Sequence, residues 1–398
     1  MTGQTCDMAI AGGGLAGGLI ALAMARARPD MTVRLIEAGP VLGGNHRWSL
    51  FASDLTDQGR ALLSPIRQTS WAGGNDVIFP RHRRRLATPY CSIGSTDFAQ
   101  SLERELPQGT IMTGSMIAAL DAGGVSLADG TRIDAHRVID ARGFVPTPHL
   151  TGGWQVFMGR HLRTPAPHGL ERPIIMDASV EQLGGYRFVY VLPLGASELF
   201  VEDTYYQDTP DLDHATLAQR IDTYCHAAGW NGAVLGEETG VLPVITGGDP
   251  AAYLAAIRTP GVALAGARGL FSHPLTSYTL PFAVQTALAI AADASLPAAD
   301  LCAKMEARSR AHWDATGFYR LLGNMLFGAA EPDRRVGIFE RFYRLNEPLI
   351  ERFYAGRSTL ADKARILVGR PPVPIGRALH ALASSRPTLD LSHESETR

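Results

Sequence analysis

The sequence predicts an α/β protein with a Rossmann-type nucleotide-binding domain, an inserted antiparallel β-sheet domain and a C-terminal helical region. Three observations lead to this fold class. Met8 to Ala11 is a short apolar run that enters a glycine-rich turn and then a helix-forming stretch, which is how a βαβ unit begins. Residues 153–244 form strand-like runs separated by turns, and the chain after Pro297 has a helical pattern.

The composition excludes several other classes of protein. Of the 398 residues, 45% are hydrophobic and 19% are charged, which suits a packed core and excludes general disorder. The net charge of -2 gives no electrostatic reason to expect a nucleic-acid partner. The four cysteines lie too far apart for a zinc site or a disulfide framework, so we expect reduced thiols and no metal. The uncharged stretch 269–292 contains two prolines and a histidine, which argues against a membrane span.

The glycine-rich turn carries Gly12, Gly14 and Gly17 in the spacing GxGxxG, and Glu37 ends the next apolar run 20 residues after Gly17. Gly12 permits the tight turn, Gly14 lets the backbone approach a pyrophosphate, and Gly17 lets the helix pack closely on the strand. Free N–H groups at the helix N-terminus favour phosphate, and Glu37 would accept hydrogen bonds from a ribose. A plain glycine turn is the alternative. Because strand, turn, helix and acid occur together, the segment predicts a dinucleotide site.

Further segments favour FAD over a nicotinamide dinucleotide. A second glycine pair follows the ribose acid in Gly43-Gly44-Asn45-His46, as in FAD-binding flavoproteins. Residues 137–143 are similar to the strand and turn that close the first half of a FAD domain, although Asp140 is alternatively an ordinary turn aspartate. The third element is an apolar strand at 262–265, followed by a loop and a helix at 282–292 whose N-terminus favours negative charge. The predicted FAD-binding residues are Gly12, Gly14, Gly17, Glu37, Gly44, Asn45, His46, Asp140, Gly266, His273, Pro274 and Tyr278.

Two adjacent carboxylates follow an apolar strand, where Leu199-Phe200-Val201 leads into Glu202 and Asp203. Side chains alternate along a strand, so these two residues are expected to point to opposite faces of the sheet. One carboxylate then enters a substrate cavity while the other anchors the structure. The alternative is an acidic strand end that faces water.

The chain resembles the flavin-dependent lycopene β-cyclases of carotenoid-making bacteria. The resemblance extends over nearly the whole length, because several independent blocks occur in the right order. These blocks are GGNHRWS at 43–49, PIIMDA at 173–178, GYRFVY at 185–190, VEDT at 201–204, RFYAG at 352–356 and PPVP at 371–374. One departure is Ser277, which stands where the family usually has glycine, and serine tolerates a positive φ less well than glycine.

This resemblance implies an isomerase of carotenoid biosynthesis that closes the ψ ends of lycopene into β-ionone rings, giving γ-carotene and then β-carotene. It implies that Glu202 is the principal acid/base and that Asp203 supports it. It also implies that FAD acts in its reduced form, with NAD(P)H as electron donor and no net redox change. Either Glu202 or the flavin gives the first proton, and the sequence leaves this choice open. His46 and His273 are either proton carriers or structural histidines.

The expected domain division has three FAD-binding parts, at 1–75, 91–150 and 256–296. An interface segment lies at 76–90, a β-rich substrate domain at 151–255 and the helical region at 297–398. The interface segment carries the basic run Arg81 to Arg85, which is a solvated face, a flavin phosphate contact or a site of attraction to anionic lipid.

The helical region is also the expected site of membrane contact. Between Arg341 and Arg370, seven Lys/Arg stand against three Asp/Glu and are mixed with aromatic residues. This composition predicts a surface that lies on an anionic bilayer without crossing it, while a helical lid on the sheet is the alternative. We therefore expect a cytoplasmic protein that associates peripherally with the inner face of the cell membrane. The oligomeric state is not predicted.

Two other functions remain open from the sequence. The first is a FAD-dependent reductase or monooxygenase acting on another prenyl or apolar substrate. Flavin hydroxylases usually carry Gly-Asp where this chain has Gly266-Ala267, which disfavours the monooxygenase. The second is a non-catalytic flavin-fold binder of prenyl groups, which the intact glycine motif disfavours.

Overall fold

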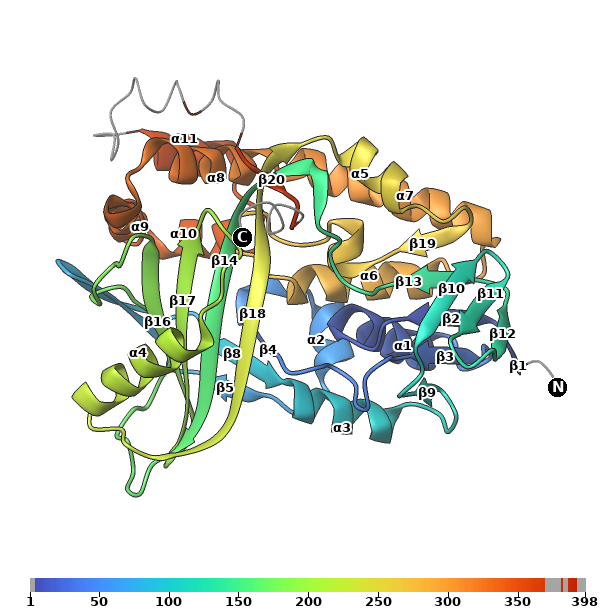
Figure 1. The fold of residues 1–398 in the computed structure, drawn as a ribbon, viewed down its shortest axis with the longest axis horizontal. Coiled ribbons are helices and arrows are strands. Elements are labelled where there is room, and N and C mark those ends of the chain that lie inside the picture. The colour runs from blue at the N-terminus through green and yellow to red at the C-terminus, as the bar shows by residue number, and fades with distance from the viewer. Residues whose placement is uncertain (1–3, 369–380, 382–385, 392–398) are drawn as a thin grey trace, which may run out of the picture.

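The computed structural model describes residues 4–368, 381 and 386–391 (Figure 1). A long-stranded sheet lies on one side, a parallel sheet lies on the other, and the C-terminal helices gather at one end of the long strands. The PPVP block at 371–374 and the last part of the expected helical region lie outside the described residues.

A five-stranded parallel sheet forms the nucleotide-binding part, with the strand order β19-β13-β2-β3-β9. Its central strands are short, apolar and buried, as expected for a parallel sheet that is covered on both faces. Helix α1, rich in glycine and alanine, packs against the sheet and against α6. The elements are β2 (Met8–Ala11), α1 (Leu15–Ala27), β3 (Val33–Ile36), β9 (Ile111–Met112), β13 (Val138–Asp140), β19 (Val262–Leu264) and α6 (Leu280–Ala292).

Two smaller sheets adjoin this part. One is an antiparallel meander of β10 (Ile117–Asp121), β11 (Gly124–Leu127) and β12 (Arg132–Ala135), with β1 (Gln4–Cys6) added in parallel. The other is an antiparallel sheet of β4 (Arg47–Phe51), β8 (Tyr90–Gly94) and β5 (Thr69–Trp71). The other helices of this half of the molecule are α2 (Asp57–Leu63), α3 (Ser95–Glu105), α5 (Pro250–Ile257) and α7 (Ala298–Ala315), with 3-10 turns η1 (Ala52–Asp54) and η2 (Gly266–Gly269).

The long-stranded sheet has the order β18-β14-β17-β16-β15-β6-β7, and β20 pairs with β14. Helix α4 (His214–Ala227) covers one face, and the other face packs against aromatic residues of the C-terminal helices. The strands are β6 (Asn75–Phe79), β7 (His82–Leu86), β14 (Thr147–Arg163), β15 (Ile174–Asp177), β16 (Tyr186–Gly195), β17 (Glu198–Gln207), β18 (Ala233–Gly248) and β20 (Thr388–Leu389).

The segment expected at the domain interface, 76–90, contributes the hairpin β6–β7 to this sheet, and β6 runs parallel to β15. Its basic run divides between two roles. Arg83 and Arg85 are exposed, whereas Arg84 donates hydrogen bonds to the carbonyl oxygens of Tyr343 and Leu345. Arg84 therefore ties the edge of the sheet to the C-terminal region.

The C-terminal region is helical, as expected. The sequence Arg-Phe-Tyr occurs at 341–343 and again at 352–354. The two copies belong to separate helices, because the chain breaks before Pro348. The hydroxyl groups of Tyr343 and Tyr354, from the two copies of the motif, lie 2.5 Å apart. The helices are α8 (Gly317–Ala329), α9 (Arg335–Phe342), α10 (Glu347–Tyr354) and α11 (Leu360–Leu367), with the 3-10 turn η3 (Pro332–Arg334). Within the described part of the chain, no helix is both long and apolar enough to span a bilayer.

Candidate active site

A continuous cavity of about 1080 Å³ runs from the glycine-rich turn after β2 to the C-terminal helices. It collects residues from the two glycine-rich segments, from the strand that carries Glu202 and from the loop before α6. Of the predicted site residues, those that line it are Gly12, Gly14, Glu37, Gly44, His46, Glu202, Gly266 and Tyr278. The others, Gly17, Asn45, Asp140, Asp203, His273 and Pro274, are not among its lining residues.

The turn after β2 has the geometry that the glycine spacing predicts. Gly12 has a φ of +98°, and a Cβ there would lie 2.9 Å from the carbonyl oxygen of Ala141. A Cβ on Gly17 would lie only 1.9 Å from the carbonyl oxygen of Gly12, so only glycine lets α1 approach the turn. Gly14 caps α1, and a Cβ there would meet nothing within 4 Å. The turn is therefore tight on its inner side and open on the cavity side.

Glu37 ends β3 and is held by backbone donors. The N–H of Gly13 donates to Oε2 at 2.7 Å, and the N–H of Gly39 donates to Oε1 at 2.7 Å. These bonds orient the carboxylate at the cavity wall beside the turn. Each oxygen retains acceptor capacity, so hydrogen bonds from a ribose remain possible.

The second glycine pair forms the next part of the wall. Gly43 and Gly44 have φ values of +77° and +63°, so the backbone needs glycine at both positions. His46 lines the cavity, and burial lowers the pKa of its imidazole. Asn45 turns away and donates to the carbonyl oxygen of Glu237 on β18, which ties this loop to the long-stranded sheet.

Asp140 lies buried at the end of β13, behind the cavity wall. It pairs with Arg142 at 2.8 Å and with Arg268 at 2.7 Å. Arg142 lines the cavity, and Arg268 belongs to the 3-10 turn after β19. Asp140 therefore fixes the two chain segments that leave β13 and β19, and it shapes the site from behind.

The loop before α6 is held by His273. This imidazole is completely buried, and burial lowers its pKa to about 3, so the ring is neutral at physiological pH. Its Nδ1 accepts from the backbone N–H of Thr276 at 3.2 Å, and its Nε2 donates to the carbonyl oxygen of Phe353 at 3.1 Å. Because both nitrogens are engaged within the protein, His273 acts here as a structural histidine. Ser277, at the glycine position of the family, has a φ of +57°.

Glu202 projects from β17 into the cavity. Its Oε1 accepts a hydrogen bond from the hydroxyl of Thr204 at 2.6 Å, and its cross-strand partner is Tyr190 of β16. Burial raises the pKa of Glu202 to about 7, Asp203 adds to the rise, and Thr204 and Arg47 oppose it. The side chain is thus a carboxyl that retains its proton close to neutral pH.

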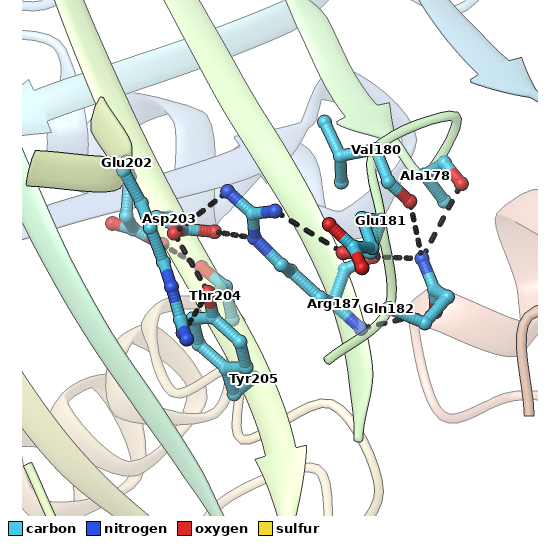
Figure 2. A network of polar contacts seen from close by, with 10 residues as sticks. Ala178, Val180, Glu181, Gln182, Arg187, Glu202, Asp203, Thr204 and Tyr205 are labelled. Atoms are coloured by element: carbon cyan, nitrogen blue, oxygen red, sulfur yellow. Dashed lines mark hydrogen bonds and ion pairs between the residues drawn. The ribbon is translucent and has the colours of Figure 1, made fainter. Parts of the chain in front are cut away.

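Asp203 points to the opposite face of β17, as alternation along the strand predicts (Figure 2). Arg187 of β16 binds both its oxygens, with Nε at 2.8 Å and Nη2 at 3.1 Å, and the hydroxyl of Tyr205 donates to it at 2.9 Å. Arg220 of α4 in turn donates to the Tyr205 hydroxyl at 2.7 Å. Burial raises the pKa of Asp203 and the Arg187 guanidinium opposes that rise. Asp203 is therefore the anchor between the sheet and α4.

The walls around Glu202 are mostly apolar and aromatic. A chain of hydroxyl groups crosses one wall, because Tyr190 bonds to Ser49 at 2.7 Å and to Tyr90 at 3.0 Å, and Tyr90 bonds to Tyr278 at 2.9 Å. These bonds satisfy the hydroxyl groups, and two of the rings, those of Tyr190 and Tyr278, line the cavity. The aromatic lining residues are Trp48, Phe144, Trp154, Phe157, Phe188, Tyr190, Tyr206, Tyr278, Phe339, Phe342, Phe353 and Tyr354.

Two charged residues of the site were missed from the sequence. Arg47 of β4 lines the cavity and its guanidinium lies 5.4 Å from the ring centroid of Phe200. Glu238 of β18 is buried, and burial, together with the charge of Glu202, raises its pKa. Arg47 stood within the matched block GGNHRWS, but no pattern in the sequence gave either residue a role.

The cavity fits a dinucleotide at its glycine-rich end. Helices α1 and α6 both begin at it without a side-chain cap and without an acidic residue in the first turn. Their N-terminal N–H groups are suited to phosphate at α1 and to a negatively charged ring at α6. Gly12, Gly14, Glu37 and Gly44 are the residues that would hold the group. The fold and this cradle together are those of the FAD-dependent oxidoreductase fold class.

The solved structures that resemble the chain belong to the same class. A geranylgeranyl bacteriochlorophyll reductase-like protein from Thermoplasma acidophilum has a TM-score of 0.60 at 14% identity, covering 96% of this chain and 99% of that chain. A flavin-dependent brominase has a TM-score of 0.60 at 15% identity, covering 89% of this chain and 94% of that chain. At these identities the likeness shows the fold alone.

The sequence comparisons are more specific. Residues 7–380 match the lycopene cyclase protein family. The lycopene beta-cyclase of Paracoccus sp. (strain N81106 / MBIC 01143) is 44% identical over 391 residues, covering 97% of this chain and 99% of that protein. The lycopene beta-cyclase of Pantoea ananas is 40% identical over 380 residues, covering 95% and 98%. The chain belongs to the lycopene cyclase family, which confirms the resemblance drawn from its sequence blocks.

Proposed function

We propose that the protein cyclises the ψ ends of lycopene to β-ionone rings in carotenoid biosynthesis, from lycopene through γ-carotene to β-carotene. The observation that carries this proposal is Glu202, a carboxyl with a raised pKa in the wall of an apolar cavity that continues into a dinucleotide cradle. Membership of the lycopene cyclase family supports the choice of substrate.

Glu202 is the proton donor. Its proton goes to C2 of the ψ end and leaves a tertiary cation at C1. The C5=C6 double bond then attacks C1, which forms the ring bond and moves the positive charge to C5. Loss of a proton from C6 restores the double bond in the ring. One proton is gained and one is lost, so the reaction is an isomerisation without net oxidation or reduction.

An alkene is a poor base, so the acid needs to be un-ionised and close to the carbon. Burial of Glu202 meets the first condition, because it disfavours the carboxylate form. The apolar cavity walls meet the second condition, which is closeness of the acid to the carbon. Lycopene has no heteroatom, so only the shape of the cavity and apolar contacts can hold it beside Glu202. The aromatic faces of Tyr190 and Phe188, which both line the cavity, would stabilise the cationic stage and exclude water.

FAD in its reduced form is the proposed cofactor, with NAD(P)H as electron donor. When bound, the reduced flavin supplies negative charge that offsets the positive charge developing on the substrate. The residues placed to hold the cofactor are Gly12, Gly14, Glu37 and Gly44, together with the first turn of α6. Asp203 supports Glu202 from the far face of the strand, because its negative charge helps to raise the pKa of Glu202.

The proposal includes peripheral contact with the inner face of the cell membrane, where a C40 hydrocarbon resides. The cavity reaches Leu367 at the end of α11, which is 47% exposed. Leu360 and Val368, at the two ends of the same helix, are 84% and 63% exposed. Exposed apolar residues beside the cavity suit a helix that lies on a lipid surface.

The decisive experiment is anaerobic incubation of the protein with lycopene and chemically reduced FAD, followed by chromatography and mass measurement. Cyclised products with the mass of lycopene support the proposal. A change of mass indicates a reductase or monooxygenase instead, and unchanged lycopene with tight binding indicates a prenyl-binding protein. Glu202→Gln is expected to bind FAD and lycopene but to cyclise lycopene far more slowly, and normal turnover by this variant would contradict the acid role.

A further inference from the structure

Glu238 lies on the same face of the sheet as Glu202. Both are cross-strand partners of Gly159, Glu202 from β17 on one side of β14 and Glu238 from β18 on the other. Cross-strand partners project to the same face, and strands are about 4.8 Å apart, so the two Cα atoms are about 10 Å apart. Gly159, which lies between the two glutamates on β14, has no side chain.

Gly159 leaves room for two neighbouring side chains on this face of the sheet, Phe200 and Glu238. A Cβ at this position would lie 3.2 Å from Cγ of Glu238 and 2.3 Å from the ring of Phe200. The ring of Phe200 and the stem of Glu238 therefore share the space above the glycine. Any larger residue at 159 would displace both.

Arg47 is the cation that both carboxyls share. The charge of Glu238 acts on Arg47 more strongly than that of Glu202, and Arg47 lowers the pKa of each carboxyl. Two ionised carboxyls and one guanidinium carry a net charge of about −1. The three groups together are neutral only when the two carboxyls share one proton, which is the form that burial favours.

Two titratable groups near the pair are engaged with other partners. Glu237, the neighbour of Glu238, points to the opposite face and pairs with Arg160 at 2.8 Å. His161 of β14 pairs with Glu198 at 3.2 Å. The remaining groups that face or act on the cluster are Asp203 of β17, Tyr190 of β16, Asp97 of α3 and His46.

We propose that Glu238 and Glu202 hold one proton between them, with Arg47 balancing the remaining charge, so that Glu202 is presented un-ionised to the cavity. Glu238 is not among the cavity-lining residues and acts through Glu202, so it is a positioning residue. The inference rests on the proposed acid role of Glu202. Because the pair holds a single proton, it gives that proton to the substrate and is restored by the proton that the substrate loses from C6 in the same turnover.

The first test measures the proton directly. Infrared spectroscopy of the FAD-loaded protein, with and without labelled glutamate, follows the carbonyl stretch of protonated carboxyls as a function of pH. In Glu238→Gln the midpoint of the remaining carboxyl is expected to fall by about one pH unit or more, because a neighbouring negative charge is removed. In Arg47→Gln both midpoints are expected to rise. Glu237→Gln is the matched control, because it removes a carboxylate from the adjacent position on the other face of the sheet. In this variant the midpoints of Glu202 and Glu238 are expected to remain unchanged.

The second test is the pH profile of turnover. Glu238→Gln is expected to lose activity at lower pH than the wild type, with little change in KM, and Glu238→Asp is expected to retain most of the wild-type profile. A uniform loss at every pH, with unchanged infrared midpoints, would show a merely structural role and overturn the inference. If lycopene is not cyclised at all, the infrared titration still reports on the pair, so failure of the proposed function and failure of this inference are separable.

Discussion

Glu202 and Asp203 are adjacent in the sequence but serve opposite faces of β17. Glu202 lines the cavity, while Asp203 is completely buried against Arg187 beneath α4. Substitutions at the two positions should therefore have different consequences, one for chemistry and the other for stability.

Glu202→Gln is expected to reduce the rate of cyclisation about 10²- to 10⁴-fold, because an amide cannot donate the required proton. The fold should be preserved, since glutamine has the same shape and can still accept a hydrogen bond from Thr204. The measurement is product formation under anaerobic conditions, together with the FAD absorption spectrum of the variant. Loss of FAD binding in parallel with activity would contradict this separation.

Asp203→Asn is expected to lower the free energy of unfolding by about 3 kcal/mol, because it leaves the buried Arg187 guanidinium without its counter-charge. Denaturant unfolding measures the effect. Glu198→Gln is the control on the same strand, where the pair with Arg163 is exposed and should contribute less than about 1 kcal/mol. Equal losses from the two variants would refute the anchoring role of Asp203.

The rate of cyclisation is expected to fall as pH rises through about 7, because the active form of Glu202 is the protonated one and its pKa lies near that value. The contribution of Glu202 to the free energy of unfolding should also fall as pH rises. Burial raises the pKa of Glu202 from 4.5 to about 7, so the folded state binds more protons than the unfolded state between these values. The free energy of unfolding is then highest below about pH 4.5 as far as this group is concerned, and it declines up to about pH 7. Thermal unfolding across this range, compared with Glu202→Gln, isolates the contribution.

The parts of the site that the sequence predicted are those whose geometry is local. The spacing of Gly12, Gly14 and Gly17 determines one turn, and the alternation of Glu202 and Asp203 requires only that the segment be a strand. The turn and the alternation each depend only on residues that are close together in the sequence, so the sequence pattern can reveal them.

Arg47 and Glu238 could not be found in this way. They reach Glu202 because β4 packs near the sheet and because the register of β14 sets Gly159 opposite both glutamates. Register depends on the pairing of strands that are distant in sequence, and a one-residue slip would turn Glu238 to the face of Glu237. The break between α9 and α10 is likewise not determined by sequence, because Pro348 permits either a kinked helix or two helices.

Ser277 offers a test of backbone strain beside the predicted flavin site. Its φ of +57° is left-handed, which costs a residue with a Cβ about 1 kcal/mol, while its hydroxyl donates to the carbonyl oxygen of Pro243 at 3.0 Å. Ser277→Ala and Ser277→Gly both remove the hydroxyl, but only glycine relieves the strain. The glycine variant is therefore expected to be more stable than the alanine variant by about 1 kcal/mol in denaturant unfolding. At Ser70, in the strand β5, the order should reverse, and the same order at both sites would contradict this account.

Membrane contact is the last prediction. Binding to anionic vesicles is expected to be weak and salt-sensitive, and stronger than binding to neutral vesicles, because the C-terminal region carries an excess of basic residues. The double variant Leu360→Ser, Val368→Ser removes exposed apolar surface at α11 and should lower vesicle affinity at least about tenfold.

The matched control for this variant is Val234→Ser, Leu235→Ser. These residues are also exposed, at 46% and 43%, but they lie at the start of β18, at the opposite end of the long strands from α11 (Figure 1). If α11 is the contact, the control binds vesicles like the wild type, and delivery of lycopene from vesicles slows only in the α11 variant. Equal affinity for neutral and anionic vesicles, or equal losses in both double variants, would show that this face does not meet the membrane.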